Sequence, residues 1–215
     1  MFINSANLMG GGSEPSSYRG FGRIHLEAGM PLNGDGAMAL FVEDLAEIGA
    51  DDYKSVLLNV DADAGLELRA TLSWIDPAAT SVSAVQLVND LDLRVIAPNG
   101  EKFYMWADDP WDTVNVNERV IVSAEDIAAN GGGTWEVRVR SRNFATNTQS
   151  YSLVVAGPIS PPVDTSDEYG VMAAAVDDDG TAEAAAPATV TGSIPFLLAA
   201  ASALAAVFVS AWVSA

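Results

Sequence analysis

The side chains of this sequence that are best suited to chemistry are acidic, and two of them lie only two positions apart. Asp90 and Asp92 alternate with Leu91 and Leu93 in a run typical of a β-strand. Because successive side chains of a strand point to opposite faces, the two carboxylates share one face at a spacing of about 7 Å. Two like charges this close repel each other unless a cation bridges them.

This acidic pair predicts a calcium site. Calcium takes roughly six to eight oxygen ligands, which carboxylates, side-chain amides and loop carbonyls supply. Asp76 and Asn89 provide such oxygens from nearby loops and strand ends. We therefore expect a calcium site formed by Asp76, Asn89, Asp90 and Asp92.

Two alternatives to this site stay open. The acidic face could be solvated and neutralised by basic neighbours such as Arg94 and Arg138. Short acidic turns at residues 61–63 and 108–112 are weaker candidates for a metal, because such turns are common without one.

Other kinds of site are excluded by residue type. The chain has no cysteine, which excludes disulfides, thiolate nucleophiles and cysteine-ligated metals. His25 is the only histidine, so no multi-histidine metal site exists. The net charge of -19 repels phosphate backbones and anionic lipids, and we expect no nucleic-acid partner.

The elements that position the acidic pair are predicted to be strands. Residues 135–140 place apolar side chains on one face and charges on the other, and the same period of two recurs in residues 66–74, 91–95 and 151–155. Turn sequences at 98–100 and 130–133 separate these runs. Eight strands are predicted near 39–44, 54–61, 66–75, 88–97, 101–106, 116–123, 134–142 and 149–156. This pattern favours an all-β sandwich of two sheets over residues 36–157, with a jelly roll as the first choice.

The C-terminal quarter has a different composition. Residues 158–193 contain seven acidic residues, no basic residue and little bulky apolar surface, and are predicted to be a disordered stalk. Residues 194–215 carry no charge and would span about 33 Å as a helix. Either a transmembrane helix or the signal for a glycolipid anchor fits this run. Both place the sandwich on the extracellular or lumenal side of a membrane.

Several motifs carry a resemblance to a known family. Residues 72–77 (LSWIDP), 87–93 (LVNDLDL), 97–100 (APNG) and 117–120 (NERV) resemble the C-terminal β-barrel that follows the catalytic domain in some subtilisin-like serine proteases. Residues 2–6 (FINSA) and 20–26 (GFGRIHL) resemble the last helix and the closing segment of the catalytic domain itself. Residues 1–35 are therefore expected to be the end of a subtilase catalytic domain.

The resemblance implies a secreted or membrane-anchored serine endopeptidase and an accessory barrel that binds calcium. The three motifs that carry the catalytic Asp, His and Ser in this family are absent here. A serine nucleophile needs a base, and His25 stands where the family has asparagine, so we expect no catalytic residue and no activity in this chain alone. The chain is predicted to be the downstream part of such an enzyme, with the missing catalytic domain as its partner.

A stand-alone module on the cell surface is the alternative. Tyr104, Trp106 and Trp111 could form a stacking platform for sugars if their rings are exposed. Apolar residues of the first segment, such as Phe2 and Leu8, would in contrast indicate a protein neighbour that covers them.

Overall fold

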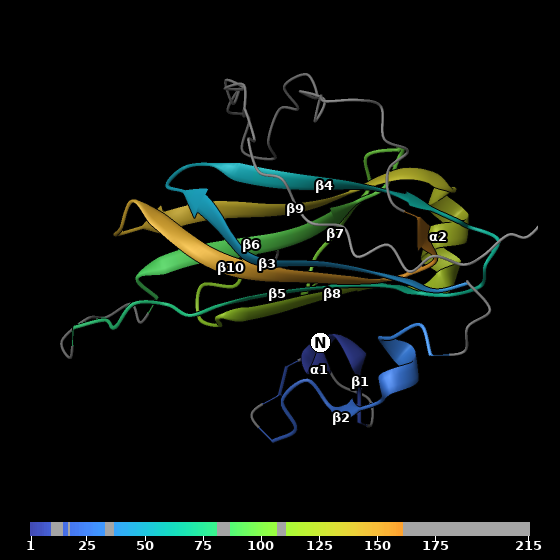
Figure 1. The fold of residues 1–215 in the computed structure, drawn as a ribbon, viewed down its shortest axis with the longest axis horizontal. Helices are drawn as coiled ribbons and strands as arrows, with labels where there is room; N and C mark the ends of the chain where they lie inside the picture. Colours follow the sequence, from blue (N-terminus) through green and yellow to red (C-terminus); the bar gives the residue numbers. More distant parts are fainter. Residues whose placement is uncertain (10–14, 17, 33–36, 81–86, 107–110, 161–215) are drawn as a thin grey trace, which may run out of the picture. The chain divides into compact units, whose positions relative to one another are not determined.

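The computed structural model describes residues 1–9, 15–16, 18–32, 37–80, 87–106 and 111–160. All of them belong to one compact unit, Met1–Val163. Two antiparallel sheets form its body (Figure 1). The predicted all-β sandwich is confirmed.

The four-stranded sheet has the order β3-β10-β5-β8, and the five-stranded sheet has the order β11-β4-β9-β6-β7. The strands of the first sheet are β3 (Ala39–Gly49), β10 (Thr148–Gly157), β5 (Leu68–Trp74) and β8 (Asn117–Val122). Those of the second are β11 (Ile159–Ser160), β4 (Tyr53–Val60), β9 (Gly133–Phe144), β6 (Asn89–Ile96) and β7 (Lys102–Phe103).

The core lies between the two sheets. It is formed by the apolar side chains that alternate with polar ones along the strands. Leu68, Ala70 and Leu72 of β5 face Leu91 and Leu93 of β6 in one buried apolar cluster. All of these side chains are at most 1% exposed. Burial of a leucine stabilises the fold by roughly 1.5–3 kcal/mol, so this register is strongly fixed.

All eight predicted strands are present, with three differences in extent. β3 continues beyond its predicted end at residue 44 to Gly49. β7 has only two residues, because the chain leaves the sheet after Phe103. β11 pairs with β4, so the sandwich extends to Ser160 and the first residues assigned to the stalk belong to it. The rest of the predicted stalk and residues 194–215 lie outside the described residues. Among the helices of the described part, none is long and apolar enough to cross a membrane.

One short helix, α2 (Ala124–Asn130), was not predicted. Ser123 caps it by accepting a hydrogen bond of 3.0 Å from the Asp126 N–H. Gly131 ends it with a φ of 85°, which a residue without a side chain adopts readily. Ile127 fixes the helix to the core, where it is 1% exposed.

The edge strand β3 contains a bulge. Its pairing with β10 shifts register between Tyr151 and Leu153. Leu45 lies at the shift with a φ of 56° and a side chain that is 75% exposed. A left-handed backbone at a non-glycine residue is uncommon, and here it interrupts an otherwise regular strand.

The described residues among the first 32 form a separate layer on the outer side of the four-stranded sheet (Figure 1). They comprise helix α1 (Phe2–Ser5), the strand pair β1 (Ala6–Asn7) and β2 (Arg23–Ile24), and the 3₁₀ helix η1 (Leu26–Ala28). The His25 N–H donates to Ser5 O at 3.1 Å and ties the two halves of the segment together.

Candidate functional site

The predicted acidic pair is buried rather than solvated. Asp90 and Asp92 are 3% and 4% exposed, while Leu91 and Leu93 between and beside them point into the core. Asp90 Oδ1 and both carboxylate oxygens of Asp92 accept no hydrogen bond. Buried carboxylate oxygens without a donor are costly, so this position needs a proton or a cation.

A third carboxylate, Glu118 of β8, lies beside this pair and was not predicted. Glu118 is 3% exposed. Its Oε2 accepts a hydrogen bond of 2.6 Å from the main-chain N–H of Leu93, and its Oε1 has no partner. The N-E-R-V motif contains this residue, but no spacing rule in the sequence links it to β6.

Arg142, Arg94 and Arg140 attract the negative charge of Asp92, and of these Arg94 was predicted. Arg142 Nε lies 3.6 Å from Asp92 Oδ2, and its guanidinium stacks 3.9 Å from the ring centre of Trp111. Arg138 instead bonds Glu136 and lies over the ring of Tyr53, at 4.6 Å from its centre.

The three carboxyl groups titrate above their usual range. Burial raises the pKa of Asp90 to about 6, and Asp112 and Asp76 add to the effect against the attraction of Arg142. Burial, and then the negative charge of Asp90, raises the pKa of Asp92 to about 7. The pKa of Glu118 is raised well above its ordinary value, first by burial and then by Asp92.

The other two predicted ligands have different partners. Asp76 accepts hydrogen bonds from the N–H groups of Val88 at 2.7 Å and Asn89 at 2.8 Å, and so closes the loop before β6. Asn89 Nδ2 donates to Thr146 Oγ1 at 2.6 Å and Gln149 Oε1 at 2.9 Å. Asn89 Oδ1 accepts from two main-chain N–H groups of the loop after β9. Asp90, Asp92 and Glu118, in contrast, each have at least one buried carboxylate oxygen that accepts no hydrogen bond.

Within the described ranges, no three His, Cys, Asp or Glu side chains are gathered closely enough to hold a metal ion as they stand. Asp112 accepts from the N–H of Val114 and from Asn115, which leaves it inside its own turn. Asp61 accepts from the Asp63 N–H in an exposed turn. Residues 108–109 lie outside the described residues.

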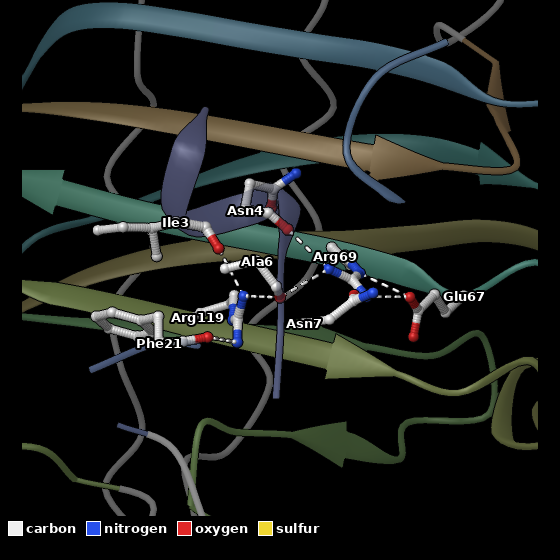
Figure 2. Close-up of polar contacts among 8 residues, drawn as sticks. All are labelled: Ile3, Asn4, Ala6, Asn7, Phe21, Glu67, Arg69 and Arg119. Carbon is white, nitrogen blue, oxygen red and sulfur yellow. Dashed lines mark hydrogen bonds and ion pairs between the residues drawn. The ribbon is translucent and has the colours of Figure 1, made fainter. Parts of the chain in front are cut away.

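A second polar site joins the N-terminal segment to the four-stranded sheet (Figure 2). Arg119 of β8 donates from Nη1 to Ile3 O at 2.6 Å and to Ala6 O at 2.5 Å, and from Nη2 to Phe21 O at 3.0 Å. Its guanidinium also lies 5.4 Å from the ring centre of Phe21. Arg119 is only 1% exposed, although it lies on the outer face of the sheet.

Arg69 of β5 completes this site from the neighbouring strand. It donates from Nη1 to Asn4 O at 3.1 Å and to Ala6 O at 3.0 Å, and from Nη2 to Asn7 Oδ1 at 2.7 Å. Glu67 pairs with the same guanidinium through Nε at 2.7 Å. The two arginines therefore bind four main-chain carbonyls of the segment, as Figure 2 shows.

The glycines of the predicted closing segment explain how close this packing is. Gly22 has a φ of 102°, and a Cβ built on it would lie 2.1 Å from the main-chain oxygen of Asn7. Gly20 also has a positive φ, of 53°, but has open space around it. Only a residue without a side chain permits the close approach of the main chain at Gly22 to the main chain at Asn7.

The other predicted candidates differ in their exposure. The His25 side chain is exposed. Trp106 and Trp111 are half-buried, and one face of Trp111 is covered by Arg142. Tyr104 packs 6.3 Å from Trp111 between ring centres, at a tilt of 59°. Tyr104 and Trp111 therefore do not form a flat, open platform, and the hydroxyl of Tyr104 is buried.

No protein-family model matches the sequence, and no curated protein matches it. Function is therefore inferred from the side chains and contacts of the chain itself.

Proposed function

We propose that this chain is the C-terminal part of a secreted or membrane-anchored subtilisin-like serine endopeptidase. In this proposal the β-sandwich is an accessory domain, and residues 1–35 are the end of the catalytic domain. The chain lacks the Asp/His/Ser triad and has no proteolytic activity alone. One observation carries the proposal. Arg69 and Arg119 of the sandwich bind the N-terminal segment, and this segment resembles the closing segment of the protease.

The exposed apolar side chains of this segment also support the proposal that it belongs to a catalytic domain. Phe2, Leu8, Ile24 and Leu32 are 65%, 52%, 53% and 56% exposed. Single exposed apolar residues are ordinary, but several on about 30 residues favour a protein neighbour over solvent. A catalytic domain would cover them.

The order of the strands supports the jelly roll within this proposal. One sheet has the order β3-β10-β5-β8 and the other contains β4-β9-β6-β7, in which β7 is short, and the chain crosses from one sheet to the other between β3, β4, β5 and β6. Eight strands in two Greek keys are the jelly-roll arrangement. A fold alone does not define an activity, so the proposal depends on the segment and its contacts.

The proposal is tested on the native protein. An antibody raised against the recombinant 215-residue chain is used to capture the antigen from the source cells and their medium, and the antigen is labelled with a fluorophosphonate that modifies active serine hydrolases. We expect a labelled antigen much larger than 22.4 kDa. The recombinant chain, which lacks the triad, is the unlabelled control.

An unlabelled antigen of about the size of this chain would contradict the protease proposal and favour the stand-alone surface module. Fractionation of the same sample tests the membrane anchor proposed for residues 194–215. The antigen should partition with membranes, and treatment with a phospholipase that cleaves glycolipid anchors separates the two kinds of anchor.

A calcium site at Asp90, Asp92 and Glu118 is a second proposal, and it concerns the cofactor of the same module. The three carboxylates would have to move closer together to hold the ion. Their buried oxygens that accept no hydrogen bond support the proposal, because a hard cation would neutralise them. Main-chain carbonyls and water would have to complete the ligand set. Asp76 and Asn89, whose polar atoms already bind protein groups, would support the loop around the ion.

Thermal unfolding with calcium and with a chelator tests this second proposal. We expect calcium to raise the midpoint for the chain and not for Asp92→Asn, while Asp61→Asn, in an exposed turn, responds as the unchanged chain does. A calcium concentration of about 100 times Kd stabilises a protein by roughly 2.7 kcal/mol. An unchanged midpoint would contradict the proposed calcium site without affecting the protease proposal.

A further inference from the structure

The arginine site recognises the N-terminal segment mainly through its main chain. Arg69 and Arg119 donate to main-chain oxygens of Ile3, Asn4, Ala6 and Phe21 in the described part of this segment, and Arg69 also donates to a side chain, at Asn7 Oδ1. Asn4 adds one side-chain contact, accepting from Thr71 Oγ1 at 2.9 Å. A site of this kind selects a backbone shape, a single helical turn followed by an extended strand, more than it selects a sequence.

The site is also held by strands that the segment does not build. Thr71 and Arg119 are register partners across β5 and β8, and Arg69 lies two residues before Thr71 on the same face. On the opposite face of these strands, Ala70, Leu72 and Val120 pack in the core. The sandwich therefore positions both guanidiniums through its own register.

We propose that the outer face of β5 and β8 is a docking site for polypeptide main chain, and that residues 1–32 occupy it as a non-covalent ligand. The segment then stays bound when the connection to the sandwich at residues 33–36 is cut. This inference deepens and rests on the proposed function, because the segment is there the end of the catalytic domain. An endopeptidase that nicks its own linker would keep its accessory domain attached through the two arginines.

The burial of the segment supports a tight contact. Asn4, Ser5 and Ala6 are at most 3% exposed. Gly29 packs against Ser5 so closely that an added Cβ would lie 2.7 Å from its Cα. Hydrogen bonds from a charged donor are stronger than those between neutral groups, and these are shielded from water.

The experiment uses the full chain with a recognition sequence for a specific protease inserted within residues 33–36. After cleavage, size-exclusion chromatography at micromolar concentration separates a retained segment from a released one, and surface capture of the sandwich gives the release rate. We expect the cleaved segment to co-elute with the sandwich. Arg69→Met and Arg119→Met should each release it at least about tenfold faster, which corresponds to about 1.4 kcal/mol.

Matched variants separate recognition from folding. Arg23→Met removes the same charge from an exposed residue of the segment and should leave the release rate unchanged. Asn7→Ala alters only the segment, so it cannot unfold the sandwich, and it should speed release by losing its contact with Arg69. Near-ultraviolet circular dichroism of each variant, dominated by the tryptophans of the sandwich, verifies its fold.

Loss of the segment from the cleaved, otherwise unchanged chain would overturn the inference, as would equal release from Arg23→Met and Arg119→Met. Exchange of labelled segments between two cleaved molecules would support it, because an exchangeable ligand must bind without the covalent connection. None of these readouts requires proteolytic activity, so failure here is distinguishable from failure of the proposed function.

Discussion

Glu118 and Leu93 connect the two sheets through a hydrogen bond of 2.6 Å from the Leu93 main-chain N–H to Glu118 Oε2. Glu118 belongs to β8, the edge strand of the four-stranded sheet, and Leu93 belongs to β6 of the other sheet. β7 covers β6 only at Val95 and Ile96, so the carboxylate satisfies an N–H that lies beyond the reach of that strand.

Replacement of Glu118 separates its hydrogen-bonding role from its charge. Glu118→Ala leaves a buried N–H without an acceptor and should lower the free energy of unfolding by about 1–3 kcal/mol. Glu118→Gln keeps an acceptor and removes a charge beside Asp92, so it should destabilise far less. Urea unfolding near pH 8 in a chelator measures both. Equal losses for the two variants would contradict the role given to the Leu93 contact.

Stability without a divalent cation should fall as the pH rises. The pKa of Asp92 is about 7 in the folded chain against an ordinary value of 3.8, so the folded state holds this proton more tightly than the unfolded state does. The stabilisation is complete below about pH 4 and is lost as the pH rises to about 7, by a few kcal/mol. Asp90, with a pKa of about 6, contributes in the same direction.

Unfolding by urea at about pH 5 and about pH 8 in a chelator measures this slope. Asp92→Asn, which cannot ionise, should remove the part of the slope that comes from Asp92 and leave the part that comes from Asp90 and Glu118. Calcium should restore stability at the higher pH if the second proposal holds. A stability that rises over this interval would contradict the burial of uncompensated carboxylates.

Asn89→Asp tests whether Asn89 holds a loop or an ion. The new carboxylate would replace the donor to Thr146 and Gln149 by an acceptor, which should cost roughly 2–4 kcal/mol. Asn99→Asp makes the same change at an exposed turn and should cost little. Tighter calcium binding by Asn89→Asp, measured by calorimetry, would instead indicate a ligand.

Two glycines of the N-terminal segment form a matched pair. Gly20→Ala meets only the cost of a positive φ, roughly 1–2 kcal/mol. Gly22→Ala meets the same cost and also a collision with the main chain of Asn7, so it should open the β1–β2 pairing. Hydrogen exchange of the Arg23 and Ile24 amides measures this opening. Equal protection in the two variants would contradict the close approach.

The sandwich could be predicted from the sequence because its signal is local. Each strand buries one face, and residues such as Leu91 and Leu93 repeat with the period of a strand. The short helix α2 was missed since seven residues carry little periodicity, although Ser123 and Asp126 form a recognisable cap.

The two polar sites could be predicted only in part. Asp90 and Asp92 stand out by their spacing, whereas Glu118 reaches them from β8 through tertiary packing. Arg69 and Arg119 lie at positions that alternate with apolar residues, which in sequence indicates a solvated face. Burial of their guanidiniums depends on a segment that is distant in the sequence, and no local pattern encodes that contact.

The bulge in β3 also affects how this protein meets other copies of itself. An edge strand of eleven residues offers unpaired main-chain groups on which a foreign strand could add. Leu45 breaks the regular spacing of those groups, and Asp44 places an exposed carboxylate beside it. The β3 edge of the four-stranded sheet is thereby guarded against edge-to-edge polymerisation, a hazard for any β-rich domain that works at high local concentration.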